Sequence, residues 1–220
     1  MLAKELITDT IVPLKTSDTG MQALMWMEDF KVSHLPIVNE REFLALVTES
    51  DISQLGDAEE PLGNLQLSKS MVYVYDNQHI YDVVNLFHEH KLTLVPVVDA
   101  KNNYLGSITL PTLLEGLARD SSILNPGGII VIEVDQKSYD PGEIVRIVES
   151  NDAKILSLQV STTVDSTRLK VTIKVNRIDI APIIQTFTRY QYLISATFAE
   201  KDDIDELKER YDSLMKYLNI

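Results

Sequence analysis

The sequence predicts an α/β chain of the α+β type, in which a tandem repeat of two small units is followed by a third domain and a C-terminal helix. Three observations support this prediction. A pattern in residues 1–120 occurs twice, about sixty positions apart. A breaker cluster, Asn125-Pro126-Gly127-Gly128, then interrupts the chain. Beyond it, apolar runs with the periods of strands and helices alternate in the order βαββαβ.

The composition is that of a globular protein with more than one core. The 220 residues are 45% apolar and 24% charged, which is close to the average of folded domains, and the chain exceeds a typical domain of about 100–150 residues. Cysteine is absent, which excludes disulfides and cysteine metal sites. The formal net charge of −13 disfavours nucleic acid, because phosphate backbones are bound by clustered Lys and Arg. The sequence has no apolar run long enough to cross a bilayer, so we expect a cytoplasmic protein that binds no membrane.

Two proline-containing strands anchor the repeat. His34-Leu35-Pro36-Ile37-Val38-Asn39 is echoed by Leu94-Val95-Pro96-Val97-Val98-Asp99. An amphipathic pattern before each strand predicts a helix, and a second apolar run follows each strand after a polar turn. The turn of the second copy is one residue longer, and turns are where a repeat tolerates an insertion. Because one copy of about 60 residues makes a marginal core, we expect the two copies to pack on each other.

Local signals predict the elements of each copy. Ser17 or Thr19 can cap the first helix, and Asp76 or Asn77 can cap the helix of the second copy. Polar turns close the two predicted hairpins. The apolar side chains expected to face the core are Met21, Leu24 and Met27 in the first helix, and Ile80, Val83, Val84 and Phe87 in the second.

This repeat resembles a pair of CBS domains over about residues 1–120. The resemblance lies in the proline strand that follows a helix, and in a second strand ending in Thr-x-x-Asp, here Thr48-Glu49-Ser50-Asp51. It implies a regulatory pair that binds an adenosine-containing ligand such as AMP, ATP or S-adenosylmethionine. In that family the Thr and Asp of the motif hold the ribose, and backbone near the first strand contacts the base. Carried onto this chain, the first cleft would consist of Val12, Pro13, His34, Leu35, Pro36, Thr48 and Asp51.

Two interpretations of the Thr-x-x-Asp motif stay open. A carboxylate at a helix start can accept two hydrogen bonds from a vicinal diol, and such charge-assisted bonds contribute about 1.5–3 kcal/mol. Alternatively, Asp51 offsets the helix dipole and Thr48 satisfies a backbone group. In the second copy the motif reads Thr109-Leu110-Pro111-Thr112, so a weaker cleft is expected there. Its residues would be Val95, Pro96, Thr109 and Thr112.

The third domain resembles an ACT domain. Its βαββαβ order is ferredoxin-like, and Asp140-Pro141-Gly142-Glu143 followed by an apolar helix matches the first loop and helix of that family. The resemblance implies a small effector, such as an amino acid, bound near this loop between paired domains, with Asp140, Gly142 and Glu143 as the effector loop. An ordinary explanation is also open, because Asp140 can cap the helix and Pro141 suits its first turn. A CBS pair followed by an ACT domain resembles acetoin-utilisation accessory proteins in domain order.

The C-terminal segment 200–220 predicts an amphipathic helix with an acidic polar face. We expect this face to keep the helix off anionic lipid, so that the apolar side docks on the protein body or on a second subunit. The apolar positions are Ile204, Leu207, Tyr211, Leu214 and Leu218. The expected domain bounds are 1–60 and 61–122 for the two CBS domains, 123–127 for a linker, 128–199 for the ACT-like domain and 200–220 for this helix.

The sequence favours a sensor over an enzyme. Glycine-rich phosphate loops and Gly-x-Ser-x-Gly motifs are absent from it. His88 and His90 lie two positions apart and do not share a helix face, so we expect no metal site, and no cofactor is indicated. The first hypothesis is a homodimeric regulatory protein that senses an adenosine-type ligand, AMP before ATP because basic residues near the motifs are few, and that acts on a partner protein. The alternative is an assembly module without ligand, acting through protein contacts.

Overall fold

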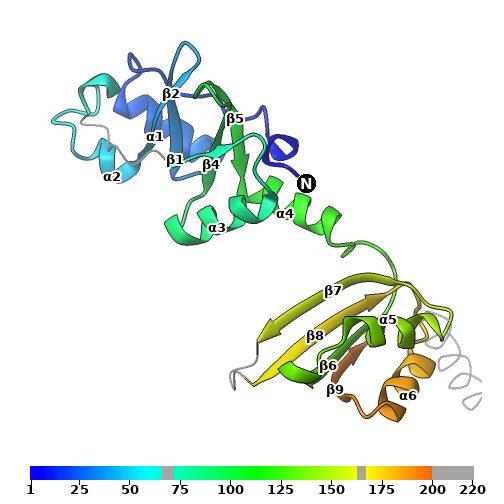
Figure 1. Cartoon of the computed structure of the whole chain (residues 1–220). Coiled ribbons are helices and arrows are strands. Elements are labelled where there is room, and N and C mark those ends of the chain that lie inside the picture. The colour runs from blue at the N-terminus through cyan, green and yellow to red at the C-terminus, as the bar shows by residue number, and fades with distance from the viewer. Residues whose placement is uncertain (66–71, 163–166, 200–220) are drawn as a thin grey trace, which may run out of the picture. The chain divides into compact units, whose positions relative to one another are not determined.

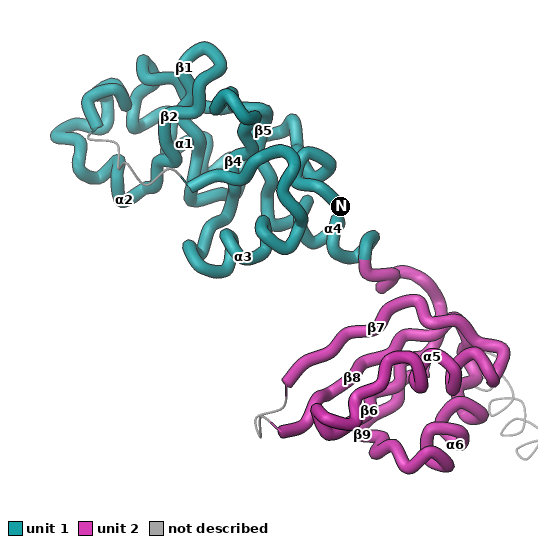
Figure 2. The backbone as a smooth tube through the Cα atoms, in the orientation of Figure 1, with its two compact units in different colours: residues 1–120 teal, residues 121–220 magenta. Residues whose placement is uncertain are grey.

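The computed structural model describes residues 1–65, 72–162 and 167–199. The chain divides into two compact units, Met1–Asp120 and Ser121–Ile220, drawn in teal and magenta in Figure 2. Each unit is described by itself below. The predicted helix at 200–220 lies outside the described residues.

The first copy of the repeat contains α1 (Gly20–Phe30), β1 (His34–Asn39), β2 (Glu42–Thr48) and the short α2 (Glu49–Ile52). Thr19 caps α1, because its side chain accepts a 3.2 Å hydrogen bond from the Gln22 amide. The helix buries Ala23 and Met27, whereas Met21 remains 43% exposed. Met21 was therefore wrongly placed on the core face, where the small Ala23 lies instead.

The second copy contains β3 (Val74–Tyr75), α3 (Ile80–His90), β4 (Leu94–Val98), β5 (Tyr104–Thr109) and α4 (Leu110–Asp120). The predicted caps of α3, Asp76 and Asn77, are wrong. His79 caps this helix, since its Nδ1 accepts from the Tyr81 amide at 3.3 Å, and the Asp82 carboxylate in turn accepts from the His79 amide at 3.1 Å. The helix buries Ile80, Val83 and Phe87 as predicted.

The two copies meet through their hairpins (Figure 1). Strands β1 and β2 pair antiparallel, as do β4 and β5. The hairpins are joined to each other, because the Tyr104 amide donates to the Arg41 carbonyl at 2.7 Å and the Phe43 amide donates to the Asn102 carbonyl at 3.1 Å. Leu94 of the second copy packs in the core of the first. The expected packing of the two copies follows from these contacts.

The first residues of the chain belong to the core of the second copy. Ala3 and Leu6 are buried among its side chains, and the Ala3 amide donates to the Gln78 carbonyl at 2.9 Å. Further along, Leu14 pairs parallel with Ile37 of β1. The N-terminal run thus crosses from one copy to the other, which periodicity alone does not reveal.

The second unit has the predicted βαββαβ order. Its elements are β6 (Ile129–Asp135), α5 (Pro141–Glu149), β7 (Ile155–Thr162), β8 (Arg168–Val175), α6 (Ala181–Arg189) and β9 (Leu193–Phe198). The strands form an antiparallel sheet in the order β7-β8-β6-β9, which is the ferredoxin-like arrangement. Helices α5 and α6 cover one face and bury Ile144, Ile147 and Phe187 against it (Figure 1). The α+β fold class is confirmed.

Within the described ranges, the structure contains no helix that is both long enough and apolar enough to cross a membrane.

Candidate functional site

The Thr-x-x-Asp motif of the first copy forms a capping box at the end of β2. The Thr48 hydroxyl donates to Asp51 Oδ2 at 2.7 Å, and the Thr48 amide donates to the same oxygen at 2.8 Å. The Asp51 amide returns a 3.2 Å bond to the Thr48 hydroxyl. Thr48 and Asp51 therefore have the structural role that the sequence left open, because they cap the short helix α2. Within residues 1–65, 72–162 and 167–199, none of the hydrogen bonds reaches Asp51 Oδ1, so this half-buried oxygen can still accept one from a ligand.

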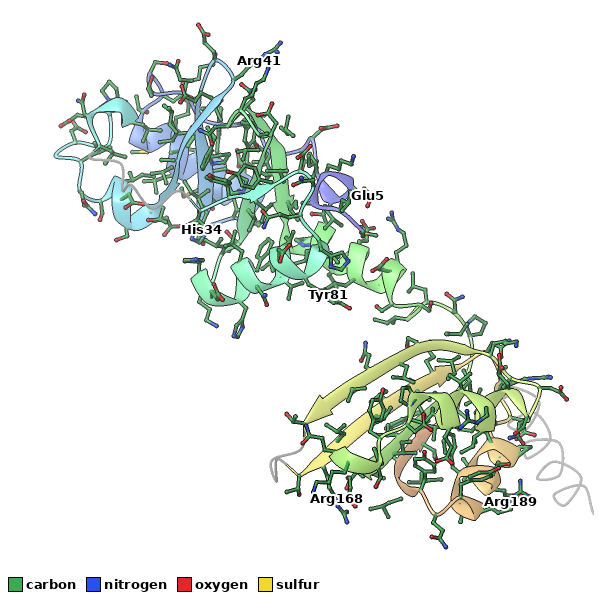
Figure 3. The ribbon with its side chains drawn as sticks, in the orientation of Figure 1. Glu5, His34, Arg41, Tyr81, Arg168 and Arg189 are labelled. Atoms are coloured by element: carbon green, nitrogen blue, oxygen red, sulfur yellow. The ribbon has the colours of Figure 1, made fainter. Side chains whose placement is uncertain are left out.

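His34 lies beside this motif and connects the two copies. It pairs with Thr48 across the hairpin, and its Nδ1 lies 3.0 Å from the Thr93 hydroxyl of the second copy. Burial lowers the pKa of His34, and the nearby Asp51 carboxylate opposes this shift only in part. Figure 3 shows His34 and Arg41 at opposite ends of the first hairpin. Arg41 is thus too distant to neutralise a phosphate at Asp51.

The structure separates Val12 and Pro13 from the motif with which the sequence grouped them. Ile37 of β1 pairs with Ala45 of β2 and also with Leu14, so the N-terminal run and β2 lie on opposite edges of β1. Pro13 lines a pocket of about 360 Å³ that includes Val38 and Glu40, at the hairpin end of β1. Val12 is 50% exposed. This separation follows from the parallel pairing of the run with β1.

The second motif, in contrast, lines a pocket built from both copies. Thr109 and Thr112 border a space of about 650 Å³, and Thr93 and Lys31 lie on its other sides. Lys31 ends α1 in a left-handed conformation. The remaining lining residues are Thr8, Thr10, Ile11, Phe30, Val32, Leu110 and Pro111. Sequence reasoning missed Lys31 and the two N-terminal threonines, and no signal in the sequence places them here.

The remaining residues of the two predicted clefts are part of the core. Leu35 and Val95 are fully buried, and Pro36 and Pro96 are also buried in β1 and β4. The Pro36 carbonyl accepts a 2.8 Å hydrogen bond from the Leu14 amide. These four residues therefore position the strands.

In the second unit, Asp140 caps α5. Its Oδ1 accepts a 2.8 Å bond from the Gly142 amide, and its Oδ2 lies 3.5 Å from the Arg146 guanidinium. Glu143 points elsewhere, because its Oε2 accepts a 2.6 Å hydrogen bond from the Tyr192 hydroxyl at the start of β9. Burial and this bond raise the pKa of Tyr192. The predicted loop thus combines a cap with a carboxylate held in place by a tyrosine that the sequence did not indicate.

Glu143 and Tyr192 line a pocket of about 320 Å³. Its walls combine carboxylates with a guanidinium, since Glu133 and Asp135 lie 3.9 and 3.8 Å from Arg168. Among the described residues no group of three or more His, Asp or Glu side chains is arranged to hold a metal ion. The charged lining of this pocket therefore consists of Glu133, Asp135, Glu143 and Arg168.

Comparison with known proteins matches one copy of the repeat to a known family. Residues 62–119 match the family model of the CBS domain, and the first copy repeats the same hairpin and helix order. The second copy thus matches the CBS domain, and the first copy is similar to it in the order of its elements.

The chain is 25% identical over 114 residues to inosine-5'-monophosphate dehydrogenase of Methanocaldococcus jannaschii, a match that covers 51% of this chain and 23% of the enzyme. It is 24% identical over 115 residues to the CBS domain-containing protein YhcV of Bacillus subtilis, covering 50% of this chain and 81% of that protein. The crystal structure of a CBS domain pair/ACT domain protein from Thermotoga maritima is similar, with a TM-score of 0.49 and 24% identity, over 54% of this chain and 98% of that chain. The chain thus spans about a quarter of the length of the dehydrogenase.

Proposed function

We propose that this protein is a non-catalytic regulatory protein whose CBS pair binds an adenosine-type ligand, with AMP as the preferred nucleotide. The observation that carries the proposal is the Thr48 and Asp51 motif, where Asp51 Oδ1 remains open to a ligand. The pocket at Thr109 and Thr112 is formed by segments of both copies and supports a second, weaker site. Its volume of about 650 Å³ lies within the range of about 300–1,000 Å³ of small-molecule sites. A ligand bound there would contact both copies and could shift their arrangement.

By the equivalence of the two copies, we propose a related cleft at Thr48 and Asp51. The two motifs end in Asp51 and Thr112, and of these Asp51 carries a carboxylate. Its Oδ1 is available to a ribose diol. We propose the tighter binding in this first cleft and weaker binding at Thr112.

The preference for AMP rests on charge. Among the described residues, Lys31 is the one cationic side chain that lines the second pocket, and the chain as a whole carries a formal charge of −13. A triphosphate would meet few compensating charges in this environment, whereas a monophosphate carries roughly half as much negative charge and needs less compensation.

The second unit is proposed to be an ACT domain that binds a small effector, and its place after the CBS pair is proposed to follow the domain order of acetoin-utilisation accessory proteins. Glu143 would hold an ammonium group, because the Tyr192 hydroxyl fixes its carboxylate. The protein is proposed to act as a homodimer on a partner protein. The alternative, an assembly module without ligand, is favoured by the capping box, which gives Thr48 and Asp51 a structural role.

The experiment that tests the sensor is a thermal-shift titration with AMP, ATP, adenosine, S-adenosylmethionine and amino acids. At a hundred times its dissociation constant, a ligand stabilises the folded state by about 2.7 kcal/mol. We expect AMP to raise the melting temperature by several degrees, and Asp51→Asn to remove most of this shift. The asparagine keeps an oxygen for the Thr48 amide but loses the charge.

Thr112→Ala serves as the matched variant in the second copy and should leave most of the AMP shift intact. If Thr112→Ala abolishes the shift and Asp51→Asn does not, the tighter site is in the other cleft. The absence of any shift with every ligand would favour the assembly module. Light scattering on the same samples should report a dimer.

A further inference from the structure

A second pocket of the second unit lies at the opposite end of the sheet from the predicted effector loop. Ile129 at the start of β6 pairs with Lys174 near the end of β8, whereas Asp135 at the end of β6 pairs with Arg168. The effector loop follows β6, and this pocket is formed by the turn after α5, the turn after β8 and the start of α6. Its volume is about 450 Å³, within the range of about 300–1,000 Å³ of small-molecule sites. The lining residues are Asn151, Asn176, Arg177, Ile178, Asp179, Pro182 and Ile183.

Three polar side chains of this pocket are each held by one hydrogen bond to a backbone group. Arg177 Nε donates to the Asp152 carbonyl at 3.0 Å. Asn176 Oδ1 accepts from the Lys154 amide at 2.7 Å. Asp179 Oδ1 accepts a 3.1 Å hydrogen bond from the first amide of α6. These bonds restrict the three side chains before a ligand arrives, which reduces the entropy lost on binding.

Each of these side chains also has a polar group that remains available to a ligand. Within the part of the chain that the structure describes, the terminal guanidinium nitrogens of Arg177 have no hydrogen-bond or ion-pair partner, and neither do Asn176 Nδ2 and Asp179 Oδ2. The pocket therefore offers two kinds of donor and one anionic acceptor. Ile183, which is only 1% exposed, adds an apolar wall together with Ile178.

We propose that this pocket binds a small carboxylic acid that carries an amino or hydroxyl group on its α-carbon and an apolar side chain. The terminal nitrogens of a guanidinium match the two oxygens of a carboxylate, and the Asn176 amide supplies a further donor. The Asp179 carboxylate accepts from the α-substituent, and the apolar wall receives the side chain. The site is separate from the effector site proposed at Glu143, and all of its lining residues come from one chain.

An NMR titration of the full-length, ¹⁵N-labelled chain with three matched acids tests the proposal. They are L-leucine, 2-hydroxy-4-methylpentanoate and 4-methylpentanoate, which share one side chain and differ at the α-carbon. We expect the first two to shift the side-chain amide signals of Asn176 and the backbone amides of Ile178 and Ile183. The unsubstituted acid should bind at least about tenfold more weakly, because it has no donor for Asp179. The tighter of the two substituted acids shows whether the site prefers an amino or a hydroxyl group.

Asn176→Asp is the matched variant of the pocket. The aspartate keeps an oxygen for the Lys154 amide but replaces the free donor with a negatively charged acceptor, so binding of L-leucine should weaken at least about tenfold. Asp179→Asn keeps an oxygen for the first amide of α6 and should weaken L-leucine more than the hydroxy acid, because the ammonium group loses its counter-charge. Glu143→Gln, in the effector loop, is the control and should leave the shifts at Asn176 unchanged.

Three results would overturn the proposal. The first is the absence of shifts at Asn176 with both substituted acids at millimolar concentration. The second is a set of shifts confined to the surroundings of Glu143 and Tyr192, which would assign the ligand to the effector loop and support the proposed function alone. The third is undiminished binding in Asn176→Asp, which would show that the acid does not contact this pocket.

Discussion

His34 and Thr93 join the two copies of the repeat through a shared set of hydrogen bonds. His34 Nδ1 lies 3.0 Å from the Thr93 hydroxyl and accepts from the Thr93 amide at 3.4 Å, while the same hydroxyl accepts from the Ser33 amide at 2.9 Å. The Thr93 amide donates to Nδ1, so a proton on this nitrogen would oppose that bond. Together with burial, this arrangement favours the neutral imidazole.

The first prediction concerns pH. Because the pKa of His34 is lower in the folded state than its ordinary value of 6.5, the unfolded chain binds the proton first, and stability falls as pH drops below about 6.5. His34→Gln should reduce the difference in unfolding free energy between pH 7.5 and 5.5. Urea denaturation followed by fluorescence of Trp26, the single tryptophan and a residue of the same unit, measures this. His90→Gln, at an exposed position of α3, is the control, and an equal effect of both variants would contradict the prediction.

The second prediction uses two equivalent positions of the repeat. Gly106 pairs with Val97, and Ala45 pairs with Ile37 at the same place in the first copy. Gly106 has a φ of 147°, and a Cβ added to it would collide with the Ile7 side chain. Gly106→Ala should therefore destabilise the unit by about 1–3 kcal/mol.

The reverse change, Ala45→Gly, should cost only about 0.5–1 kcal/mol, because it adds flexibility without strain. Urea midpoints from Trp26 fluorescence compare the two variants. Equal losses would show that the packing of the N-terminal run against Gly106 does not constrain that position.

The features that could be predicted from the sequence are those that depend on residues close together along the chain. The Thr48 to Asp51 spacing, the Asp140 cap and the βαββαβ order are all local patterns, and the structure contains each of them. Prediction failed where packing brings distant segments together. Thr93 and His34 are 59 positions apart in the sequence but form a hydrogen bond in the fold. Lys31 lines the second pocket only because the two copies pack together.

The third prediction concerns the second unit. Tyr192 donates to Glu143 over a separation of 49 residues and thereby ties β9 to the first turn of α5. Tyr192→Phe should lower the stability of this unit by about 1 kcal/mol, because a hydrogen bond to a carboxylate is worth about 1.5–3 kcal/mol when buried and less at this half-buried site. Hydrogen exchange of the α5 amides measures the loss. Tyr190→Phe, at an exposed position nearby, should change little, and a similar effect of both variants would show that the bond contributes nothing.

The fourth prediction restores the motif of the second copy and rests on the proposed function. The Thr109 amide donates to the Thr112 hydroxyl at 2.9 Å, as the Thr48 amide donates to Asp51 at 2.8 Å. An aspartate at position 112 can take over this bond and offer a second oxygen to a ribose.

Thr112→Asp should therefore convert the weak second site into a tight one. At AMP concentrations that fill only the first site in the wild-type chain, the stoichiometry measured by calorimetry should rise from one to two per chain, whereas Thr112→Asn, which has the same size and no charge, should leave it at one. Adding Lys31→Met to Thr112→Asp should weaken the new site and spare the first, because only the pocket of the second motif is lined by Lys31 among the described pockets. A stoichiometry that stays at one in Thr112→Asp would mean that the carboxylate does not decide which cleft binds. Occupancy would then depend on the shape set by the N-terminal run that crosses between the copies.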